Sequence, residues 1–296
     1  MAFRAGMVAV VGKPNVGKST LMNAMVGQKV SIVSSKPQTT RRRVIGIVQN
    51  EGYQIALIDT PGIHEPHTKL ARAMVEAARA SLADIDVVLY VADASKKPDE
   101  LDEQIARLAK DAKAPVVVCL NKMDLLKAEF VNDRFETFCK LFGTEDCMMT
   151  TATRNHNVSK VLDLLLKYMP EGEALFPEDE YTDQSTRFMV AEIIREKVLL
   201  ATRQEIPHAT AVVVDHWEEM PNGVLHIGAS VVVEKQGQRA ILIGNKGAFV
   251  KKTGTDSRLE IEELLGRKVF LELFVKVKED WRMNPRMLQE LEYLET

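Results

Sequence analysis

Short apolar runs alternate with stretches of helical period over the first 170 residues. Four of these runs are continuously apolar, as in strands whose sheet is covered by helices on both faces. The alternation predicts a doubly wound, mostly parallel α/β domain at residues 1–170. We expect strands at residues 7–11, 44–49, 54–59, 86–92, 115–120 and 147–151, and helices at 18–26, 69–82, 99–110, 130–142 and 158–168.

The pattern changes after Pro170. Residues 171–183 carry six acidic side chains, no basic one and Pro177, a composition typical of a linker, which we place at residues 171–186. Ser185 can cap the helix that follows it. We expect helices at 187–202, 238–243 and 248–265, and strands at 209–217, 223–235 and 268–276, with a hairpin turn at 220–223. This α-β-β-α-α-β order predicts a small α+β domain at 187–279, before a helical and weakly anchored tail at 280–296.

A phosphate-binding loop is indicated by Gly12-Lys13-Pro14-Asn15-Val16-Gly17-Lys18-Ser19, which fits G-x-x-x-x-G-K-[ST]. It follows an expected strand and opens an expected helix, so its backbone N–H groups and the helix dipole can face a phosphate. Lys18 would reach the β- and γ-phosphates and Ser19 would ligate Mg²⁺. A tight turn with a surface lysine is the alternative. The expected phosphate-binding residues here are Gly12, Asn15, Val16, Gly17, Lys18, Ser19 and Thr20.

The tetrapeptide Asp59-Thr60-Pro61-Gly62 ends the third expected strand. Asp59 can hold Mg²⁺ through water, and the Gly62 amide can bond the γ-phosphate. Thr39 or Thr40 could complete the metal shell, and we choose Thr40. The expected metal ligands are therefore Ser19, Thr40 and Asp59, and the expected catalytic residues are Lys18, Ser19, Thr40 and Gly62.

A base site is indicated by Asn121-Lys122-Met123-Asp124, which follows an apolar strand. The Asp124 carboxylate can accept hydrogen bonds from N1–H and the 2-amino group of guanine. Adenine would leave that carboxylate unpaired, at a cost on the order of 10⁴-fold in affinity. The Lys122 stem can pack over the base. The expected guanine-binding residues are Asn121, Lys122, Asp124, Thr151 and Ala152, the last through its N–H to O6.

These three motifs match those of the translation-factor-like P-loop GTPases. The residue after Gly62 is Ile63, where Ras-type proteins carry a glutamine that orients water, so hydrolysis of GTP to GDP and phosphate is expected to be slow. Related GTPases with the G-x-P-N-x-G-K-S loop suggest that Asn15 helps to bind K⁺ in place of an arginine finger. The cofactors implied are Mg²⁺ with GTP or GDP, and K⁺.

The second domain contains a G-x-x-G loop at an expected helix boundary. In KH domains such a loop clamps about four nucleotides of RNA backbone. Residues 235–252 carry five basic side chains and no acidic one, which favours RNA binding over the alternative of an ordinary turn between helices. The expected RNA-binding residues are Gly244, Asn245, Lys246, Gly247, Lys251 and Lys252.

The chain as a whole carries 39 Lys and Arg against 42 Asp and Glu, a net charge of −3. This average does not exclude RNA, because the six carboxylates of the linker offset the five cations near the G-x-x-G loop. No apolar run reaches 18 residues and no signal peptide precedes the first strand, so a cytoplasmic protein is expected. Cys119, Cys139 and Cys147 are expected to be buried, reduced thiols. The histidines are expected to be exposed or hydrogen-bonded: His64, His67, His156, His208, His216 and His226.

The sequence resembles the Era family, bacterial Ras-like GTPases with a C-terminal type II KH domain, in the TrmE-Era-EngA-like GTPase superfamily. Besides the nucleotide motifs, the resemblance includes residues 37–41, 176–179, 191–197, 244–247 and 281–285, whereas Glu292 stands where the family usually has glycine. It implies a GTP-driven switch that binds 16S rRNA near its 3′ end and assists maturation of the 30S ribosomal subunit. It also implies peripheral association with the inner face of the membrane, which no residue here predicts, and we expect a monomer.

The sequence leaves two alternative functions to be weighed. A constitutive RNA-binding module could keep a nucleotide domain only for stability, although the intact Lys18, Asp59 and Asp124 argue against this. An RNA-modifying GTPase would need a catalytic Cys, His or metal cluster in the second domain, and the sequence offers none. In the leading hypothesis, GTP alters access to the G-x-x-G loop through the acidic linker.

Overall fold

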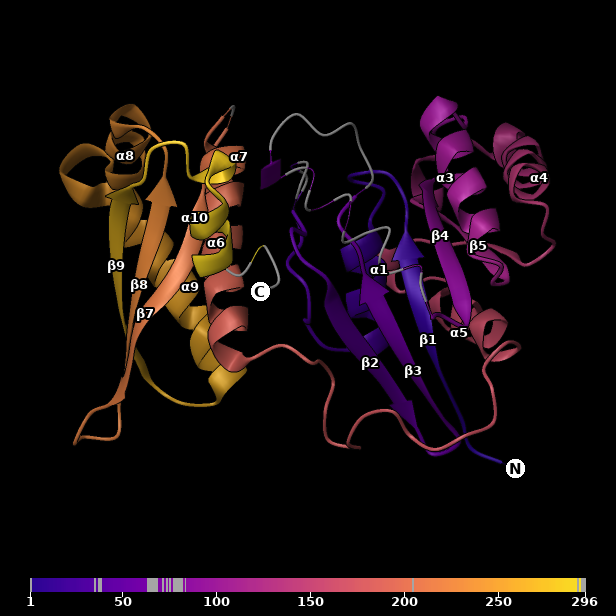
Figure 1. The fold of residues 1–296 in the computed structure, drawn as a ribbon, viewed down its shortest axis with the longest axis horizontal. Coiled ribbons are helices and arrows are strands. Elements are labelled where there is room, and N and C mark those ends of the chain that lie inside the picture. The colour runs from indigo at the N-terminus through magenta and orange to yellow at the C-terminus, as the bar shows by residue number, and fades with distance from the viewer. Residues whose placement is uncertain are drawn as a thin grey trace. The chain divides into compact units, whose positions relative to one another are not determined.

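A computed structural model describes residues 2–34, 36, 39–62, 69–70, 72, 74, 76, 82, 84–203, 205–291 and 293. The chain divides into two units, one formed mainly by residues up to Asp183 and the other mainly by residues from Gln184 onward (Figure 1). Of the helix expected at 69–82, the described positions 69, 70, 72, 74 and 76 are helical.

The first unit is built on a sheet of six strands in the order β2-β3-β1-β4-β5-β6. Only β2 runs antiparallel to its neighbour, which confirms the doubly wound, mostly parallel sheet. Its elements are β1 (Arg4–Val11), α1 (Lys18–Val26), β2 (Val44–Asn50), β3 (Tyr53–Asp59), β4 (Val87–Asp93), α3 (Glu100–Asp111), β5 (Val116–Asn121), η1 (Met123–Leu125), η2 (Ala128–Phe130), α4 (Val131–Phe142), β6 (Cys147–Met149), η3 (Ala152–Arg154) and α5 (Val158–Leu166).

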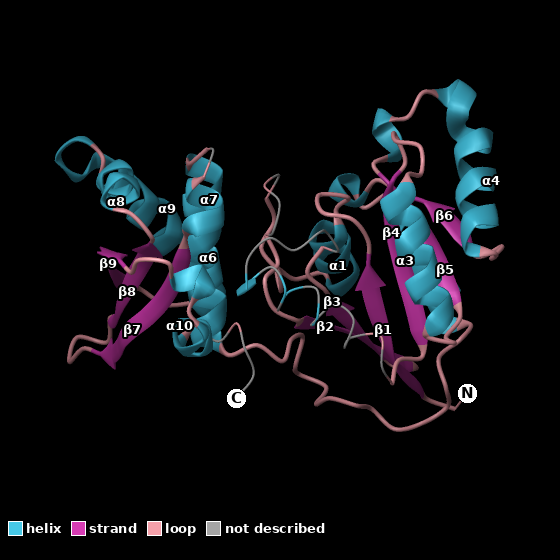
Figure 2. Cartoon of the chain, turned by 45° about the horizontal axis from the view of Figure 1, so that its top comes forward, coloured by secondary structure: helices cyan, strands magenta, loops and turns pink. Residues whose placement is uncertain are grey.

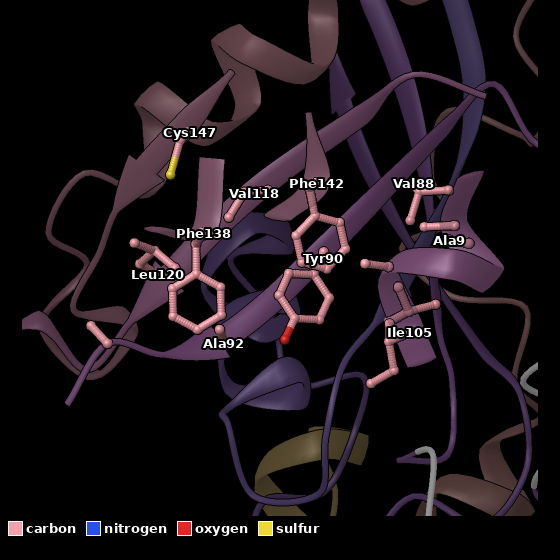
Figure 3. Packing of buried hydrophobic residues seen from close by; sticks show 14 of the residues in the cluster. Ala9, Val88, Tyr90, Ala92, Ile105, Val118, Leu120, Phe138, Phe142 and Cys147 are labelled. Carbon is pink, nitrogen blue, oxygen red and sulfur yellow. The ribbon is translucent and has the colours of Figure 1, made fainter. Parts of the chain in front are cut away.

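Helices cover both faces of this sheet. On one face, Tyr90 of β4 packs with Ile105 of α3 and Phe138 of α4 in a single apolar cluster (Figure 3). On the other face, a side chain at Gly46 of β2 would meet Met22 of α1, so the helix lies close against the strand. Because β1, β3 and β5 are parallel, the phosphate loop, the D-T-P-G turn and the N-K-M-D segment all follow the same edge of the sheet.

The acidic segment after Pro170 is attached to the first unit. The buried Gln54 side chain accepts hydrogen bonds from the N–H groups of Leu175 (2.7 Å) and Phe176 (2.9 Å) and donates to the Phe176 carbonyl (2.8 Å). Further along, Thr182 Oγ1 donates to the Ile45 carbonyl at 2.7 Å. Because β2 is an edge strand, its unpaired backbone groups can bind this segment, so parts of the expected linker are held against the first unit while residues 177–180 are exposed.

The second unit contains a sheet of three strands with β7 antiparallel to β8 and β8 parallel to β9. Helices α6, α8 and α9 lie on one face of this sheet (Figures 1 and 2), and each contributes apolar side chains to the core cluster of the unit. The elements are α6 (Thr186–Ala201), α7 (Ile206–Ala209), β7 (Ala211–Glu219), β8 (Leu225–Val233), α8 (Gln236–Ile243), η4 (Asn245–Gly247), α9 (Ala248–Leu265), β9 (Val269–Val277), η5 (Trp281–Met283) and α10 (Pro285–Glu290). The α-β-β-α-α-β order is confirmed, with the unpredicted α7 delaying the first strand to Ala211.

The end of the chain is anchored more firmly than its sequence indicates. Trp281 and Leu288 are fully buried, and Trp281 Nε1 donates a hydrogen bond to the Ala209 carbonyl at 2.9 Å. The prediction of a weakly anchored tail is therefore wrong up to at least Leu288, since a buried indole with a satisfied N–H fixes the segment to the unit.

The three cysteines are free thiols. Cys119 and Cys147 are buried as predicted, whereas Cys139 on α4 is partly exposed. Burial raises the pKa of the Cys119 thiol to about 12, so it stays protonated and unreactive near neutral pH.

Candidate functional site

The phosphate loop has a backbone that its glycines make possible. Gly17 has φ 100°, and a Cβ there would lie 2.3 Å from Asn121 Nδ2. A Cβ at Gly12 would lie 2.3 Å from the Val91 carbonyl oxygen. Side chains are excluded at both positions, and α1 begins at Lys18 directly after the loop. The loop therefore presents the N-terminus of α1 in the form that binds phosphates.

Lys18 is enclosed by the loop that precedes it. The residue is only 7% exposed, and its Nζ donates to the carbonyls of Gly12 and Lys13, both at 3.1 Å. Burial lowers the pKa of Lys18 to about 8, and the negative charge of Asp59 partly opposes this. A buried ammonium group held by two neutral carbonyls is suited to meet an anion.

Asp59 lies at the end of β3, with three hydroxyl groups around one of its oxygens. Its Oδ2 accepts hydrogen bonds from Ser19 (2.7 Å), Ser31 (3.0 Å) and Thr40 (3.1 Å). Its Oδ1 is buried and has no hydrogen-bond partner among the described residues. Burial raises the pKa of Asp59, while the Lys18 charge and the three hydroxyls act in the opposite direction. A carboxylate oxygen without a partner beside hydroxyl oxygens fits a hard cation such as Mg²⁺.

The geometry distinguishes Thr39 from Thr40, the two candidates for the third metal ligand. Thr40 Oγ1 lies 3.0 Å from Ser19 Oγ and also reaches Asp59, whereas Thr39 Oγ1 donates to the Lys36 carbonyl at 2.7 Å. Of these two threonines, only Thr40 has its hydroxyl in the Asp59 cluster, which favours Thr40 as the predicted metal ligand.

Ser31 is a member of this cluster that sequence reasoning missed. The side chain of Asn23 on α1 positions it, because Asn23 Oδ1 accepts from the N–H groups of Val30 and Ser31, both at 3.0 Å. Ser31 belongs to no recognised motif, and the sequence carries no signal that would have singled it out.

The D-T-P-G turn lies against the phosphate loop. The buried Thr60 hydroxyl donates to the Val10 carbonyl at 2.8 Å, and a Cβ on Gly62 would lie 3.0 Å from the Pro14 Cα. Gly62 is thus next to the loop, as its predicted role requires. Ile63 lies outside the described residues.

Asn121 joins the phosphate loop to the turn after β6. Its Nδ2 donates to the Val16 carbonyl at 3.0 Å, and its Oδ1 accepts from the Ala152 N–H at 3.0 Å. The Ala152 N–H, predicted to bind guanine O6, therefore has an acceptor within the protein, and Thr151 is buried beside it. The Asn121 side chain thus links the phosphate loop to the turn that contains Ala152.

Lys122 and Asp124 differ in their surroundings. Lys122 Nζ donates to the Asn15 carbonyl at 2.6 Å and to Asp93 Oδ2 at 2.9 Å. Burial of Asp93 opposes its ionisation, but hydrogen bonds from Ser95 and Lys122 lower its pKa. Asp124 is exposed in η1, and no contact occupies its carboxylate within the part of the chain that the structure describes. Asp93, which sequence reasoning missed, orients the Lys122 side chain, while the Asp124 carboxylate is left available to accept hydrogen bonds.

The G-x-x-G loop separates α8 from α9. Gly244 has φ 72°, and a Cβ there would lie 2.8 Å from Phe249 Cβ. Lys246 and Gly247 also have positive φ, of 51° and 79°. The turn exposes Asn245 and Lys246 to solvent, where they can reach a phosphate backbone.

A groove of about 260 Å³ lies between α9 and β9 next to this loop. Leu271 and Leu273 give it an apolar floor and Lys251 supplies positive charge, while Arg258, which also lines it, is paired with Glu262 at 2.9 Å. Sequence reasoning did not include Arg258 among the RNA-binding residues, although the helical period places it on the same face as Lys251. Lys252 is exposed but is not among the lining residues, which are Val250, Lys251, Gly254, Thr255, Arg258, Leu271 and Leu273.

Two of the histidines meet on the sheet of the second unit. The rings of His216 and His226 are 4.5 Å apart, and His226 Nε2 is 2.7 Å from Glu272 Oε2. His226 therefore has the hydrogen-bond partner that was expected, while His64 and His67 lie outside the described residues.

Comparisons with known proteins give matches to both units and to the whole chain. The family described as "50S ribosome-binding GTPase" matches residues 7–122, and the KH domain family matches residues 205–282. GTPase Era of Heliobacterium modesticaldum is 42% identical over 97% of this chain and 96% of its own length. GTPase Era of Geobacter metallireducens is 44% identical over 98% of each chain, and that of Lactobacillus helveticus is 45% identical over 98% of this chain and 96% of its own.

Two solved structures share this fold over 99% of the present chain and 100% of theirs, each with a TM-score of 0.96 and 40% identity. One is a variant of Aquifex aeolicus Era bound to GDP and AlF4⁻. The other is Era in complex with MgGDPNP and nucleotides 1506–1542 of 16S ribosomal RNA.

Proposed function

This chain belongs to the GTPase Era family, and we propose that it is a GTP-hydrolysing switch that binds 16S rRNA near its 3′ end and assists maturation of the 30S subunit. The proposed binding of GTP rests mainly on the buried Asp59. Its Oδ2 bonds to Ser19 and Thr40, whereas its Oδ1 has no hydrogen-bond partner among the described residues. It lies within electrostatic reach of the buried Lys18.

Each group around the phosphate loop has a defined role in this proposal. The backbone N–H groups of Asn15, Val16, Gly17, Lys18, Ser19 and Thr20 orient the phosphates, and the Lys18 ammonium offsets their charge. Ser19, Thr40 and Asp59 would hold Mg²⁺, which would supply positive charge against the phosphates. The Gly62 N–H binds the γ-phosphate and so distinguishes GTP from GDP.

Guanine recognition rests on the exposed Asp124, whose carboxylate can accept from N1–H and the 2-amino group. Asn121 and Lys122 support it by bracing the loops on which the base would lie. The Ala152 N–H would have to exchange its Asn121 acceptor for guanine O6 if it binds the base as predicted.

Hydrolysis is proposed to be slow and to depend on K⁺. The Ile63 side chain has no polar atom with which to orient a water molecule, so a second positive charge is needed at the phosphates. Asn15, exposed at the mouth of the loop, is the proposed K⁺ ligand. Turnover should be faster in KCl than in NaCl at equal ionic strength, and equal rates would contradict this part.

The evidence for RNA binding comes entirely from the second unit. The G-x-x-G loop exposes Lys246, and the adjoining groove combines an apolar floor with Lys251 and Arg258. Such a groove can bind bases against Leu271 and Leu273 while the cations neutralise phosphates. Lys252 adds charge from the same helix.

The proposed location is taken from the Era family. In this proposal the protein is a cytoplasmic monomer that attaches peripherally to the inner face of the membrane. Among the described residues, no helix is both long and apolar enough to cross a bilayer. Flotation with vesicles containing anionic lipid tests the attachment, and failure to float at low salt would remove it from the proposal.

The test of the whole function combines turnover with RNA binding. We would measure GTP hydrolysis and the affinity for an RNA of 16S nucleotides 1506–1542, with MgGDPNP or MgGDP bound and with a shuffled RNA as control. Tighter binding of the natural sequence with MgGDPNP is expected. Turnover with equal RNA affinity in both states would refute the switch, whereas RNA binding without GTP turnover would favour a constitutive RNA-binding module.

A further inference from the structure

The side chain of Lys13 points away from Lys18, although both belong to the phosphate loop. Lys13 Nζ lies 2.7 Å from Asp102 Oδ2 and 2.8 Å from Asp99 Oδ2, both at the start of α3. The Asp102 side chain is 1% exposed and that of Asp99 is 61% exposed. Of these two carboxylates, Asp102 therefore forms the buried ion pair.

Asp102 is held in place by groups on three sides. Its Oδ1 accepts a hydrogen bond from the hydroxyl of Tyr90, and its Oδ2 accepts from the Asp99 N–H at 2.8 Å as part of a capping box. Tyr90 is fully buried, and its ring stacks on Phe142 with 4.0 Å between centroids (Figure 3). The carboxylate is thus anchored to the apolar core of the unit.

The backbone of Lys13 is bonded to the other lysine of the loop. Its carbonyl accepts a hydrogen bond from Lys18 Nζ, as does that of Gly12. One residue therefore connects the buried Asp102 to the ammonium group that would bind phosphate. The pair with Asp102 also neutralises the second positive charge of the loop and keeps it on the outer side.

We propose that Asp102 is a positioning residue for GTP binding, which acts through Lys13 to hold the phosphate loop and Lys18 in their binding conformation. The inference rests on the proposed GTPase function. A loop that is already ordered loses less conformational entropy when the nucleotide binds, so the ion pair contributes to affinity. Once bound, the phosphates themselves hold the loop, and the rate at saturation depends less on the pair.

The first test replaces the charge and keeps the shape. In Asp102→Asn, Kd and KM for GTP should rise about tenfold, while kcat at saturating GTP stays within about twofold. Lys13→Met should show the same split. The double variant Lys13→Met/Asp102→Asn should weaken GTP binding no further than either single variant, because the two residues act as one unit.

A second variant separates positioning from stability. Lys13→Met/Tyr90→Phe/Asp102→Leu replaces the buried ion pair, and the buried hydroxyl that bonds to it, with apolar groups, which is often neutral for folding, so its melting temperature should return toward that of the wild type. Its GTP affinity should stay about tenfold low, because no link between α3 and the loop remains. This variant carries the test if Asp102→Asn alone does not fold.

Glu103→Gln is the matched control, since it removes a carboxylate from the same helix. Glu103 is 57% exposed and pairs only distantly with Arg107, at 3.9 Å, so GTP binding should not change. The proposal is overturned if Asp102→Asn binds GTP as tightly as this control, or if Lys13→Met/Tyr90→Phe/Asp102→Leu regains affinity together with stability. Failure of the wild-type protein to bind GTP would instead overturn the proposed function.

Discussion

Raising the pH from about 7.5 to about 8.5 is expected to weaken GTP binding, because the ammonium group that would meet the phosphates is already buried. Lys18 is enclosed by the loop, and its Nζ contacts two backbone carbonyls. Burial lowers its pKa from the ordinary value of 10.5 to about 8. The free protein therefore loses this proton close to the physiological range.

The size of the effect follows from that pKa. A shift of this size corresponds to about 3 kcal/mol against the charged form before a ligand is present. Phosphate oxygens beside Lys18 favour the charged form, so its pKa rises on binding and a proton is taken up. The protonated fraction of the free protein falls from about three-quarters at pH 7.5 to about one-quarter at pH 8.5, which weakens binding about threefold.

Calorimetric titration with GDP at pH 8, in two buffers with different ionisation enthalpies, measures this proton directly. We expect uptake of about half a proton at pH 8 and about three-quarters at pH 8.5. Lys18→Met is the control and should take up none at its weaker binding. Constant affinity together with zero uptake in the wild type would refute the reasoning, since Lys18 would then keep an ordinary pKa.

The stability of the nucleotide-free protein should respond in the opposite direction. Between pH 8 and the ordinary pKa of 10.5, the unfolded chain holds more protons at Lys18 than the folded chain does. The contribution of this residue to the free energy of unfolding therefore increases as the pH rises through that range.

Five further substitutions test separate parts of the sites. Asp124→Asn should shift the preference from GTP toward xanthosine triphosphate, because the amide can donate to the 2-carbonyl; competition binding measures this, and retained guanine preference would contradict the assignment. Thr40→Val should raise the Mg²⁺ concentration for half-maximal GTP binding about tenfold, whereas Thr39→Val should not, and equal effects would remove the distinction. Gly247→Asp strains the backbone at φ 79° by about 1–2 kcal/mol, but its Cβ would lie 4.0 Å from Val250 Cγ1, so the variant should fold and bind GTP but lose about tenfold or more in RNA affinity by filter binding. Gly244→Ala should instead lower the melting temperature, because its Cβ would lie 2.8 Å from Phe249, and an unchanged value would contradict the packing.

Helix ends with local signals were predictable from the sequence. Helices α1 and α9 were expected at residues 18–26 and 248–265, and the structure has the same bounds. Both helices are followed by a glycine in the left-handed conformation, Gly27 with φ 77° and Gly266 with φ 62°. The stop signal lies in the adjoining residue, so no tertiary contact is needed to find it.

Segments with distant partners were not predictable in this way. The acidic composition of residues 171–183 predicts a linker, but it does not show that Gln54 bonds to the backbone at Leu175 and Phe176 or that the Thr182 hydroxyl bonds to Ile45 of β2. Trp281 is fixed by the Ala209 carbonyl, 72 residues earlier in the chain. Composition describes only a segment's own preference for water and cannot show that a partner exists elsewhere.

The sequence by itself determined the chemical groups of the nucleotide motifs, their spacing and their position at strand ends, because each motif is completed within a few residues. The tertiary structure decided which groups meet around Asp59: Thr40 and Ser31 join it, while the Thr39 hydroxyl bonds to Lys36. It also decided that Lys13 is paired with Asp102, 89 residues away. The packing of α1, β3, β4 and α3 brings these groups within hydrogen-bond distance, and a linear pattern does not specify that packing.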